Sequence, residues 1–120
     1  MYVQTGLEVW SMRDGGEVVV RVVGELDFAT VPKLIDAIRD VLTDNDVANP
    51  IMDFSSVSYI DTEAIKAIIL LNKNLAENGI PLQLRNCNKK ITRIIDILGV
   101  ADEVGLVRNE DSGFLPCTKG

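Results

Sequence analysis

Three neighbouring polar residues, Asp61, Thr62 and Glu63, stand where an apolar stretch gives way to residues at helical spacing. Such a position is the first turn of a helix, where backbone N–H groups point outward with the positive end of the helix dipole. A carboxylate or a phosphate placed there is stabilised. The segment from Asp61 to Glu63 is therefore a natural place for a charge-operated switch.

The side chains that many enzymes need are missing. The chain has no histidine, which removes the commonest general base and metal ligand and every Ser-His or Cys-His nucleophile pair. No Gly-x-Gly-x-x-Gly or Gly-Lys-Ser/Thr loop follows an early strand, so a phosphate-binding loop is also missing. Asp44 and Asp46 lack the glycine and distal glutamate of a calcium loop, and a solvated loop explains them. We expect no enzyme activity, no cofactor and no metal.

Charge and hydropathy restrict the partners and the location. The net charge of −6 and the scattered basic residues disfavour direct binding to nucleic acid or to anionic lipid. The longest apolar run, residues 67–71, is far shorter than the roughly 18 residues of a membrane span, and the N-terminus does not resemble a secretory signal. Cys87 and Cys117 form no Cys-x-x-Cys motif, and we interpret them as ordinary thiols. These features predict a cytoplasmic protein without membrane insertion.

The elements that position the switch follow from the periodicity of apolar residues. Alternation around residues 5–9, the turn at 14–16 and the valine-rich run 17–23 predict a strand, a tight turn and a second strand. The second strand is apolar at almost every position except Arg21, which predicts a central strand covered on both faces. Further short strands are predicted at 50–54 and 80–84, and a short edge strand at 104–107.

Three segments have apolar residues at helical spacing. The first begins at Thr30, a plausible N-cap, and runs to about Leu42; the second is capped by Asp61 or Thr62 and ends at Asn78-Gly79. The third runs from about Lys89 to Gly99 and carries one apolar stripe formed by Ile91, Ile94, Ile95 and Leu98. A hydroxyl-rich loop is expected between the strand at 50–54 and the second helix.

The alternation of strands and helices predicts an α/β fold. Right-handed crossovers place the helices on a largely parallel sheet that has one antiparallel strand from the first hairpin. We expect one domain over residues 1–120, a small sandwich with a mixed four- to five-stranded sheet and three to four helices. Its core covers about 5–108, and 109–120 is expected to be a flexible tail.

Several short motifs occur in a fixed order along the chain. They are Gly24-Glu25-Leu26-Asp27, Asp53-Phe54-Ser55 with Val57, Ser58-Tyr59-Ile60-Asp61 before the second helix, and Ile97-Leu98-Gly99-Val100. With these motifs the chain resembles the sulfate transporter and anti-sigma factor antagonist (STAS) domain family in its free-standing bacterial form, over about residues 7–106. The resemblance implies a STAS-like fold and a role in regulating transcription through protein–protein interaction.

In that family, a free-standing domain binds an anti-sigma factor that is also a serine kinase, and so releases a sigma factor. The kinase phosphorylates a hydroxyl at the start of the second helix, where the family pattern is Asp, two small hydroxyl residues, Gly and an aliphatic residue. This chain reads Asp61-Thr62-Glu63-Ala64-Ile65, so Glu63 occupies the usual acceptor position and brings one permanent charge where a phosphate brings about two. The resemblance leaves Thr62 as the nearest acceptor, with Ser58 and Ser56 as further candidates.

The residues expected to contact the partner lie mostly around this segment. They are Asp27, Ser56, Ser58, Tyr59, Asp61, Thr62, Glu63 and Lys66. Three of these residues also have a purely structural interpretation. Asp27 and Thr62 could be helix caps, and Glu63 could be a first-turn acid that pairs with Lys66. Trp10 and Tyr59 are the only large aromatic residues expected to be exposed, and Tyr59 is the better contact candidate.

A second hypothesis follows from Glu63 in the acceptor position. The chain would then be a scaffold subunit of a larger signalling, lipid-transport or polysaccharide-regulation assembly that phosphorylation does not control. The sequence leaves the oligomeric state open.

Overall fold

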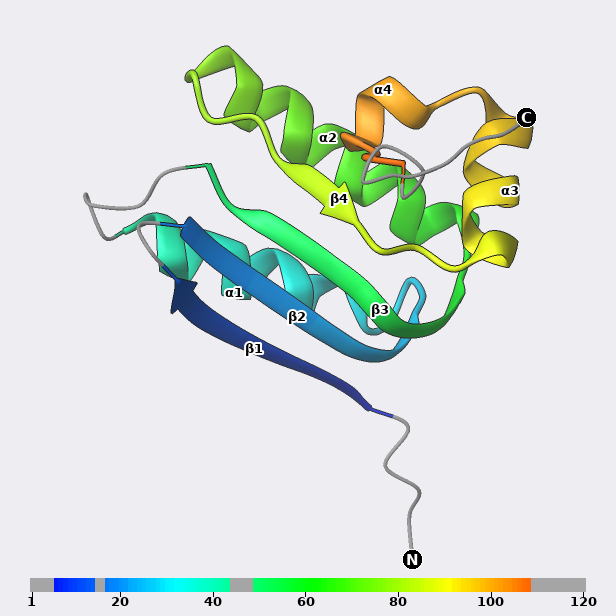
Figure 1. The fold of residues 1–120 in the computed structure, drawn as a ribbon, viewed down its shortest axis with the longest axis horizontal. Coiled ribbons are helices and arrows are strands. Elements are labelled where there is room, and N and C mark those ends of the chain that lie inside the picture. The colour runs from blue at the N-terminus through cyan, green and yellow to red at the C-terminus, as the bar shows by residue number, and fades with distance from the viewer. Residues whose placement is uncertain (1–5, 15–16, 44–48, 109–120) are drawn as a thin grey trace, which may run out of the picture.

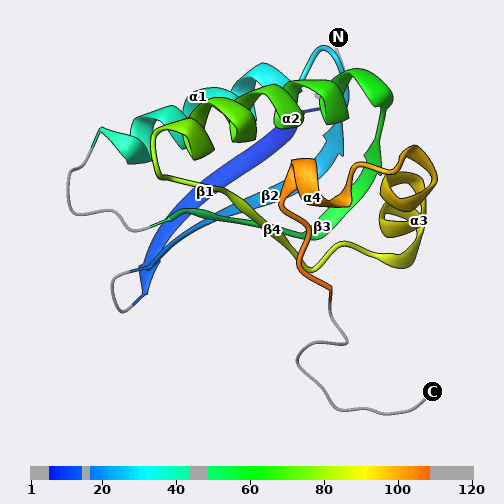
Figure 2. The ribbon, with the colours of Figure 1, turned by 90° about the horizontal axis from the view of Figure 1, so that it is seen from above.

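The protein forms a four-stranded sheet whose two long helices pack against one face (Figures 1 and 2). The computed structural model describes residues 6–14, 17–43 and 49–108. The strands are β1 (Leu7–Asp14), β2 (Glu17–Leu26), β3 (Ile51–Ile60) and β4 (Gln83–Arg85), in that order across the sheet. The helices are α1 (Val31–Leu42), α2 (Thr62–Glu77), α3 (Lys89–Leu98) and α4 (Ala101–Val104). The predicted α/β fold with a mixed sheet is confirmed, since β1 is antiparallel to β2 and the other pairs are parallel.

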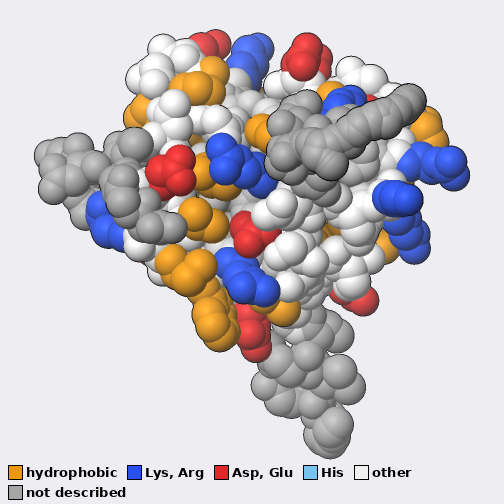
Figure 3. All heavy atoms as spheres, viewed as in Figure 1, with side chains coloured by type: hydrophobic (Ala, Val, Ile, Leu, Met, Phe, Trp, Pro, Cys, Tyr) orange, Lys and Arg blue, Asp and Glu red, His pale blue; other side chains and the backbone are white. Residues whose placement is uncertain are grey.

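The core lies between the sheet and the pair α1 and α2, which run along the same face (Figure 2). On β2, Val18, Val20 and Val22 are buried, whereas Val19 and Val23 are half-buried and Arg21 is exposed. The predicted central position of this strand is confirmed, but the predicted cover on both faces is wrong. The reason is that both long helices pack on one side of the sheet. Val19 and Val23 alternate with the buried valines along β2, so their side chains face the opposite side. We call this second side, which neither α1 nor α2 covers and which carries Trp10 opposite Arg21, the uncovered face (Figure 3).

Gly24 occupies a place in β2 that a larger residue would not fit. Its φ of +123° is unfavourable for residues with a Cβ, and a Cβ there would lie 2.8 Å from the Gly6 carbonyl oxygen. The register between β2 and β3 shifts between Arg21 and Val23 and again between Gly24 and Glu25. The glycine therefore lies in an irregular stretch of the strand, where it allows the chain before β1 to approach closely.

The strand before the second helix is longer than the sequence predicts. The sequence favours a strand at residues 50–54 followed by a hydroxyl-rich loop, but β3 continues through that segment to Ile60 and pairs with β2 up to Leu26. The predicted loop is therefore wrong. Hydroxyl side chains are compatible with a strand here because several of them face solvent, while Val57 and Ile60 point into the core.

The predicted bounds of the three main helices are confirmed. α2 ends with Asn78 as its C-cap, and α3 begins after Asn88, whose side-chain oxygen accepts a hydrogen bond of 2.8 Å from the Ile91 N–H. Gly99 ends α3 in the left-handed conformation. In the predicted apolar stripe of α3, Ile91 and Ile95 are buried and Ile94 is half-buried, whereas Leu98 at its end is 45% exposed.

The segment after α2 differs from the prediction. The strand expected at 80–84 is reduced to Gln83–Arg85, and the edge strand expected at 104–107 is replaced by α4 and a single bridge between Leu84 and Leu106. Buried Asn72 of α2 holds this region: its oxygen accepts from the Leu82 N–H at 2.8 Å, and its NH₂ donates to the Glu103 carbonyl at 3.0 Å. The Leu82 N–H and the Glu103 carbonyl are therefore bonded to a side chain, and they are not free to pair with each other in a longer edge of the sheet.

Some predictions fall on residues that the structure does not describe. They are the start of the first strand at Thr5, the turn glycines Gly15 and Gly16, the acids Asp44 and Asp46, Cys117 and the tail 109–120. Within the described ranges, no helix combines the length and the apolar composition that crossing a membrane requires.

Candidate protein-binding site

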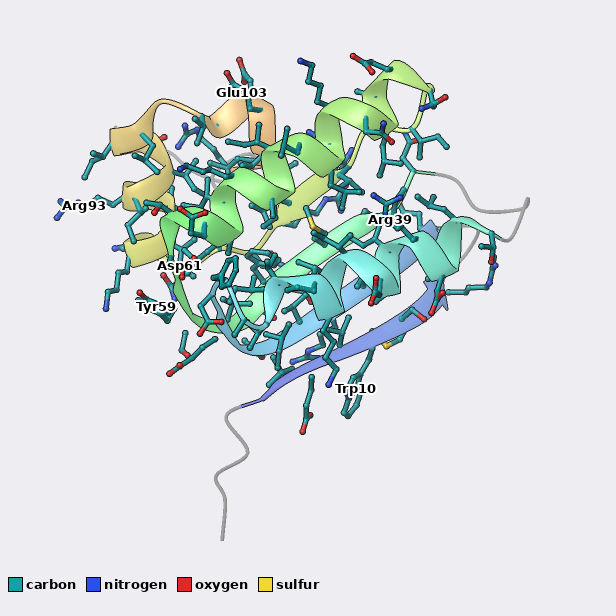
Figure 4. All side chains as sticks on the ribbon, turned by 180° about the vertical axis from the view of Figure 1, so that it is seen from behind. Trp10, Arg39, Tyr59, Asp61, Arg93 and Glu103 are labelled. Atoms are coloured by element: carbon teal, nitrogen blue, oxygen red, sulfur yellow. The ribbon has the colours of Figure 1, made fainter. Side chains whose placement is uncertain are left out.

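Apart from Ser56, the predicted site residues lie at the end of the sheet where β2 and β3 stop and α1 and α2 begin. Leu26 and Ile60 pair in register, and the Asp61 N–H donates to the Leu26 carbonyl at 3.0 Å. The turn after β2 is thus fixed against the start of α2. Figure 4 shows Tyr59 and Asp61 together at this end of the molecule, away from Trp10 on β1.

Asp61 is the N-cap of α2 and also holds the neighbouring turn. One carboxylate oxygen accepts from the Ala64 N–H at 2.8 Å, and the other accepts from the Phe28 N–H at 3.2 Å. The choice between Asp61 and Thr62 as cap is therefore settled in favour of Asp61. Thr62 is the first residue of the helix and is exposed, so its hydroxyl is accessible from solvent.

Glu63 follows in the first turn of α2 and pairs with Lys66, as the sequence suggests. Their charged atoms lie 3.4 Å apart, and both side chains are mostly exposed. An exposed pair of this kind contributes little to stability. Glu63 therefore keeps a negative charge beside the positive end of the helix dipole without being required by the fold.

Asp27 has a clear structural role in the turn before α1. Its carboxylate accepts from the Ala29 and Thr30 N–H groups, both at 2.9 Å. Thr30 is the N-cap residue of α1, as predicted, but its side chain makes no capping hydrogen bond. Its hydroxyl instead accepts from the Asp27 N–H at 2.9 Å and donates to the Glu25 carbonyl at 2.8 Å. The turn is consequently rigid, and Asp27 is placed next to the start of α2.

The two candidate serines of β3 lie in different surroundings. Ser58 is exposed near the end of the strand, where its hydroxyl donates to the Gly24 carbonyl at 3.3 Å. Ser56 pairs with Val23 and accepts from the Arg21 guanidinium at 3.3 Å, which places it on the uncovered face. Ser58 therefore belongs to the site geometrically, and Ser56 does not.

An exposed aromatic residue that the sequence analysis missed completes the site. Phe28 is 73% exposed in the turn between β2 and α1, and Tyr59 is 46% exposed at the end of β3. The exposure of Tyr59 and of Trp10, which is 58% exposed, agrees with expectation. The sequence does contain a signal for Phe28. It is a large apolar residue directly after Asp27, in the short segment that connects a strand to a helix.

A hollow away from this site lies between α3 and the segment after α4, with a volume of about 370 Å³. Its lining includes Cys87, Lys89, Arg93 and Arg108. Burial raises the pKa of the Cys87 thiol to about 12, so this cysteine is a poor nucleophile at neutral pH. In the part of the chain that the structure describes, no group of three or more acidic or cysteine side chains is placed to hold a metal ion.

Comparisons with known proteins agree with this geometry. A family model described as "STAS domain" matches residues 11–113. An anti-sigma-B factor antagonist of Listeria monocytogenes is 27% identical over 103 residues, which cover 84% of this chain and 90% of the Listeria protein. A crystal structure of an anti-sigma factor antagonist from Mycobacterium paratuberculosis superimposes with a TM-score of 0.75 at 21% identity, covering 92% of this chain and 93% of that one. The Bacillus cell fate determinant SpoIIAA in its phosphorylated form gives a TM-score of 0.59 at 19% identity, covering 89% and 96%.

Proposed function

Because the chain belongs to the STAS domain family, we propose that it is a cytoplasmic anti-sigma factor antagonist, which binds an anti-sigma factor/serine kinase and so releases a sigma factor. It acts by binding and not by catalysis. The naming of the Listeria relative as an anti-sigma-B factor antagonist supports this role.

One observation carries the proposal: Asp61 caps α2 and leaves Thr62 and Glu63 exposed in the first turn. The partner docks on this end of the sheet, over residues from the β2–α1 turn and the β3–α2 junction. Asp27, Tyr59, Asp61 and Lys66 lie in these two segments, and Ser58 lies beside them.

Glu63 makes the switch atypical. A family acceptor changes between a neutral hydroxyl and a phosphate, whereas the carboxylate of Glu63 is a permanent part of the chain. The partner of this chain therefore accepts a negatively charged first turn. Thr62 is the remaining phosphate acceptor within that turn, and Ser58 is the second candidate.

Binding and sigma release test the role directly. The purified chain should bind the purified anti-sigma factor in titration calorimetry, and its addition should restore transcription by the sigma factor that the anti-sigma factor inhibits. The double variant Thr62→Val/Glu63→Gln should bind about tenfold more weakly, since a contact between opposite charges is lost at the interface. Glu77→Gln, at the far end of α2, is the matched control. Equal affinity of the double variant and the wild type would contradict the role of this turn.

Phosphorylation is tested separately. After incubation with the anti-sigma factor kinase and ATP, intact mass measurement should detect one added phosphate. The modification should vanish in Thr62→Val and persist in Ser58→Ala.

The second candidate function is the scaffold subunit of a larger signalling, lipid-transport or polysaccharide-regulation assembly. Glu63 in the acceptor position favours it, because a fixed charge needs no kinase. Absence of any phosphate in the mass measurement, with a stable complex that lacks a kinase, would favour this candidate.

A further inference from the structure

Phe28 is the most exposed aromatic residue among those that the structure describes, at 73%. Exposed apolar surface is unfavourable in water, and aromatic residues are enriched where protein interfaces have their strongest contacts. Tyr59, on the neighbouring strand end, adds a second exposed ring close to the start of α2.

The backbone that carries Phe28 is held from both sides. Its N–H donates to Asp61 at 3.2 Å, and the next two residues donate to the Asp27 carboxylate at 2.9 Å. The turn is thus ordered before any partner arrives. Preorganisation of this kind lowers the entropy cost of binding.

Acidic residues neighbour Phe28 and Tyr59 along the backbone. Glu25 pairs in register with Tyr59 and is exposed, while Asp27 precedes Phe28 in sequence and Asp61 contacts its backbone. The partner surface that matches this arrangement is positively charged around an apolar centre.

We propose that Phe28 is the anchor of the docking surface, and that it inserts into an apolar pocket of the anti-sigma factor bordered by Arg or Lys side chains. This inference rests on the proposed function. Asp61 couples the anchor to the switch, because the same carboxylate caps α2 and holds the Phe28 N–H. Phosphorylation of Thr62 would repel Asp61 and compete for the first amides of α2, which would loosen Phe28.

The affinity test compares exposed aromatic residues. Phe28→Ala should weaken binding of the purified anti-sigma factor about thirtyfold, and Phe28→Leu should weaken it less, because an apolar side chain remains. Trp10→Ala, on the uncovered face, should bind within about twofold of the wild type. Wild-type affinity should also fall as the salt concentration rises.

The coupling is tested without a partner. Asp61→Asn keeps the oxygen that caps α2 but places an NH₂ group beside the Phe28 N–H, so the Phe28 amide resonance should shift and exchange faster with solvent.

The outcomes separate the two proposals. If the wild type does not bind the anti-sigma factor, the proposed function fails, and this inference fails with it. If the wild type binds and Phe28→Ala binds equally well, only the anchor is overturned. If the affinity of the wild type does not change with salt concentration, the proposed border of Arg or Lys side chains is overturned. If the resonance and the exchange rate of the Phe28 amide are unchanged in Asp61→Asn, the coupling is overturned.

Discussion

Glu63 and Lys66 face each other across one turn of α2, with 3.4 Å between the carboxylate oxygen and the ammonium nitrogen. Both side chains are mostly exposed, so solvent screens the pair and its contribution to stability is small. Glu63, which carries the charge of the proposed switch, can therefore be replaced without loss of the fold.

Glu63→Ser should therefore fold normally and gain a kinase site. We expect its free energy of unfolding to change by less than about 0.5 kcal/mol, because only an exposed pair is lost. Urea denaturation measures this change, and kinase treatment with intact mass measurement detects the new acceptor. Glu63→Ala is the control that lacks the hydroxyl. Failure of Glu63→Ser to fold would assign Glu63 to the structure and not to the switch.

Asn72→Ala should destabilise the protein by about 2 kcal/mol, since it leaves the buried Leu82 N–H and the Glu103 carbonyl without their partner. Asn74→Ala is a matched control on the same helix, at an exposed position, and should change the free energy of unfolding by less than about 0.5 kcal/mol. Urea denaturation of both variants gives the comparison. Equal stability of the two would mean that water replaces the Asn72 contacts.

The helices are predictable from the sequence because their signals are local. Asp61, Asn78 and Gly99 mark helix ends by their own chemistry, and apolar spacing marks the buried sides. The length of β3 is not predictable in this way, because the segment from Ser55 to Tyr59 becomes a strand only through pairing with β2.

The site is predictable in part for the same reason. Asp61, Thr62 and Glu63 are adjacent in sequence, so their grouping follows from the first turn of one helix. Phe28 joins them only through a hydrogen bond to a distant part of the chain, which no local pattern encodes. Ser56 is predicted to lie in the site because the sequence favours a loop there, whereas the strand register places it beside Arg21.

Asp53 should make stability depend on pH. Burial alone would raise the pKa of Asp53, but hydrogen bonds from the Ser55 N–H and the Asn86 side chain, with the nearby Arg21, hold it below its ordinary value. A lowered folded-state pKa stabilises the protein above the unfolded value and loses that effect as pH falls through the folded value. At pH 7, Asp53→Asn should lower the free energy of unfolding by no more than about 1 kcal/mol, since solvent screens this partly exposed carboxylate.

Thermal denaturation at pH 7 and at pH 3 tests this dependence. The difference in Tm between wild type and Asp53→Asn should shrink at the lower pH. Asp36→Asn, on the exposed side of α1, controls for the change in net charge. A difference that stays constant between the two pH values would contradict the role of the ionised carboxylate.

Cys87 should react slowly with thiol reagents although it borders the hollow beside α3. Burial raises its pKa from 9.0 to about 12, and the reacting species is the thiolate, so labelling at pH 8 should be about a thousandfold slower than that of an ordinary thiol. The measurement uses Cys117→Ser, so that Cys87 is the single cysteine, and follows the reaction with a disulfide reagent by absorbance. The same variant in denaturant provides the fast reference, because unfolding restores the ordinary pKa. Native labelling as fast as this reference would show that burial does not shield the thiol.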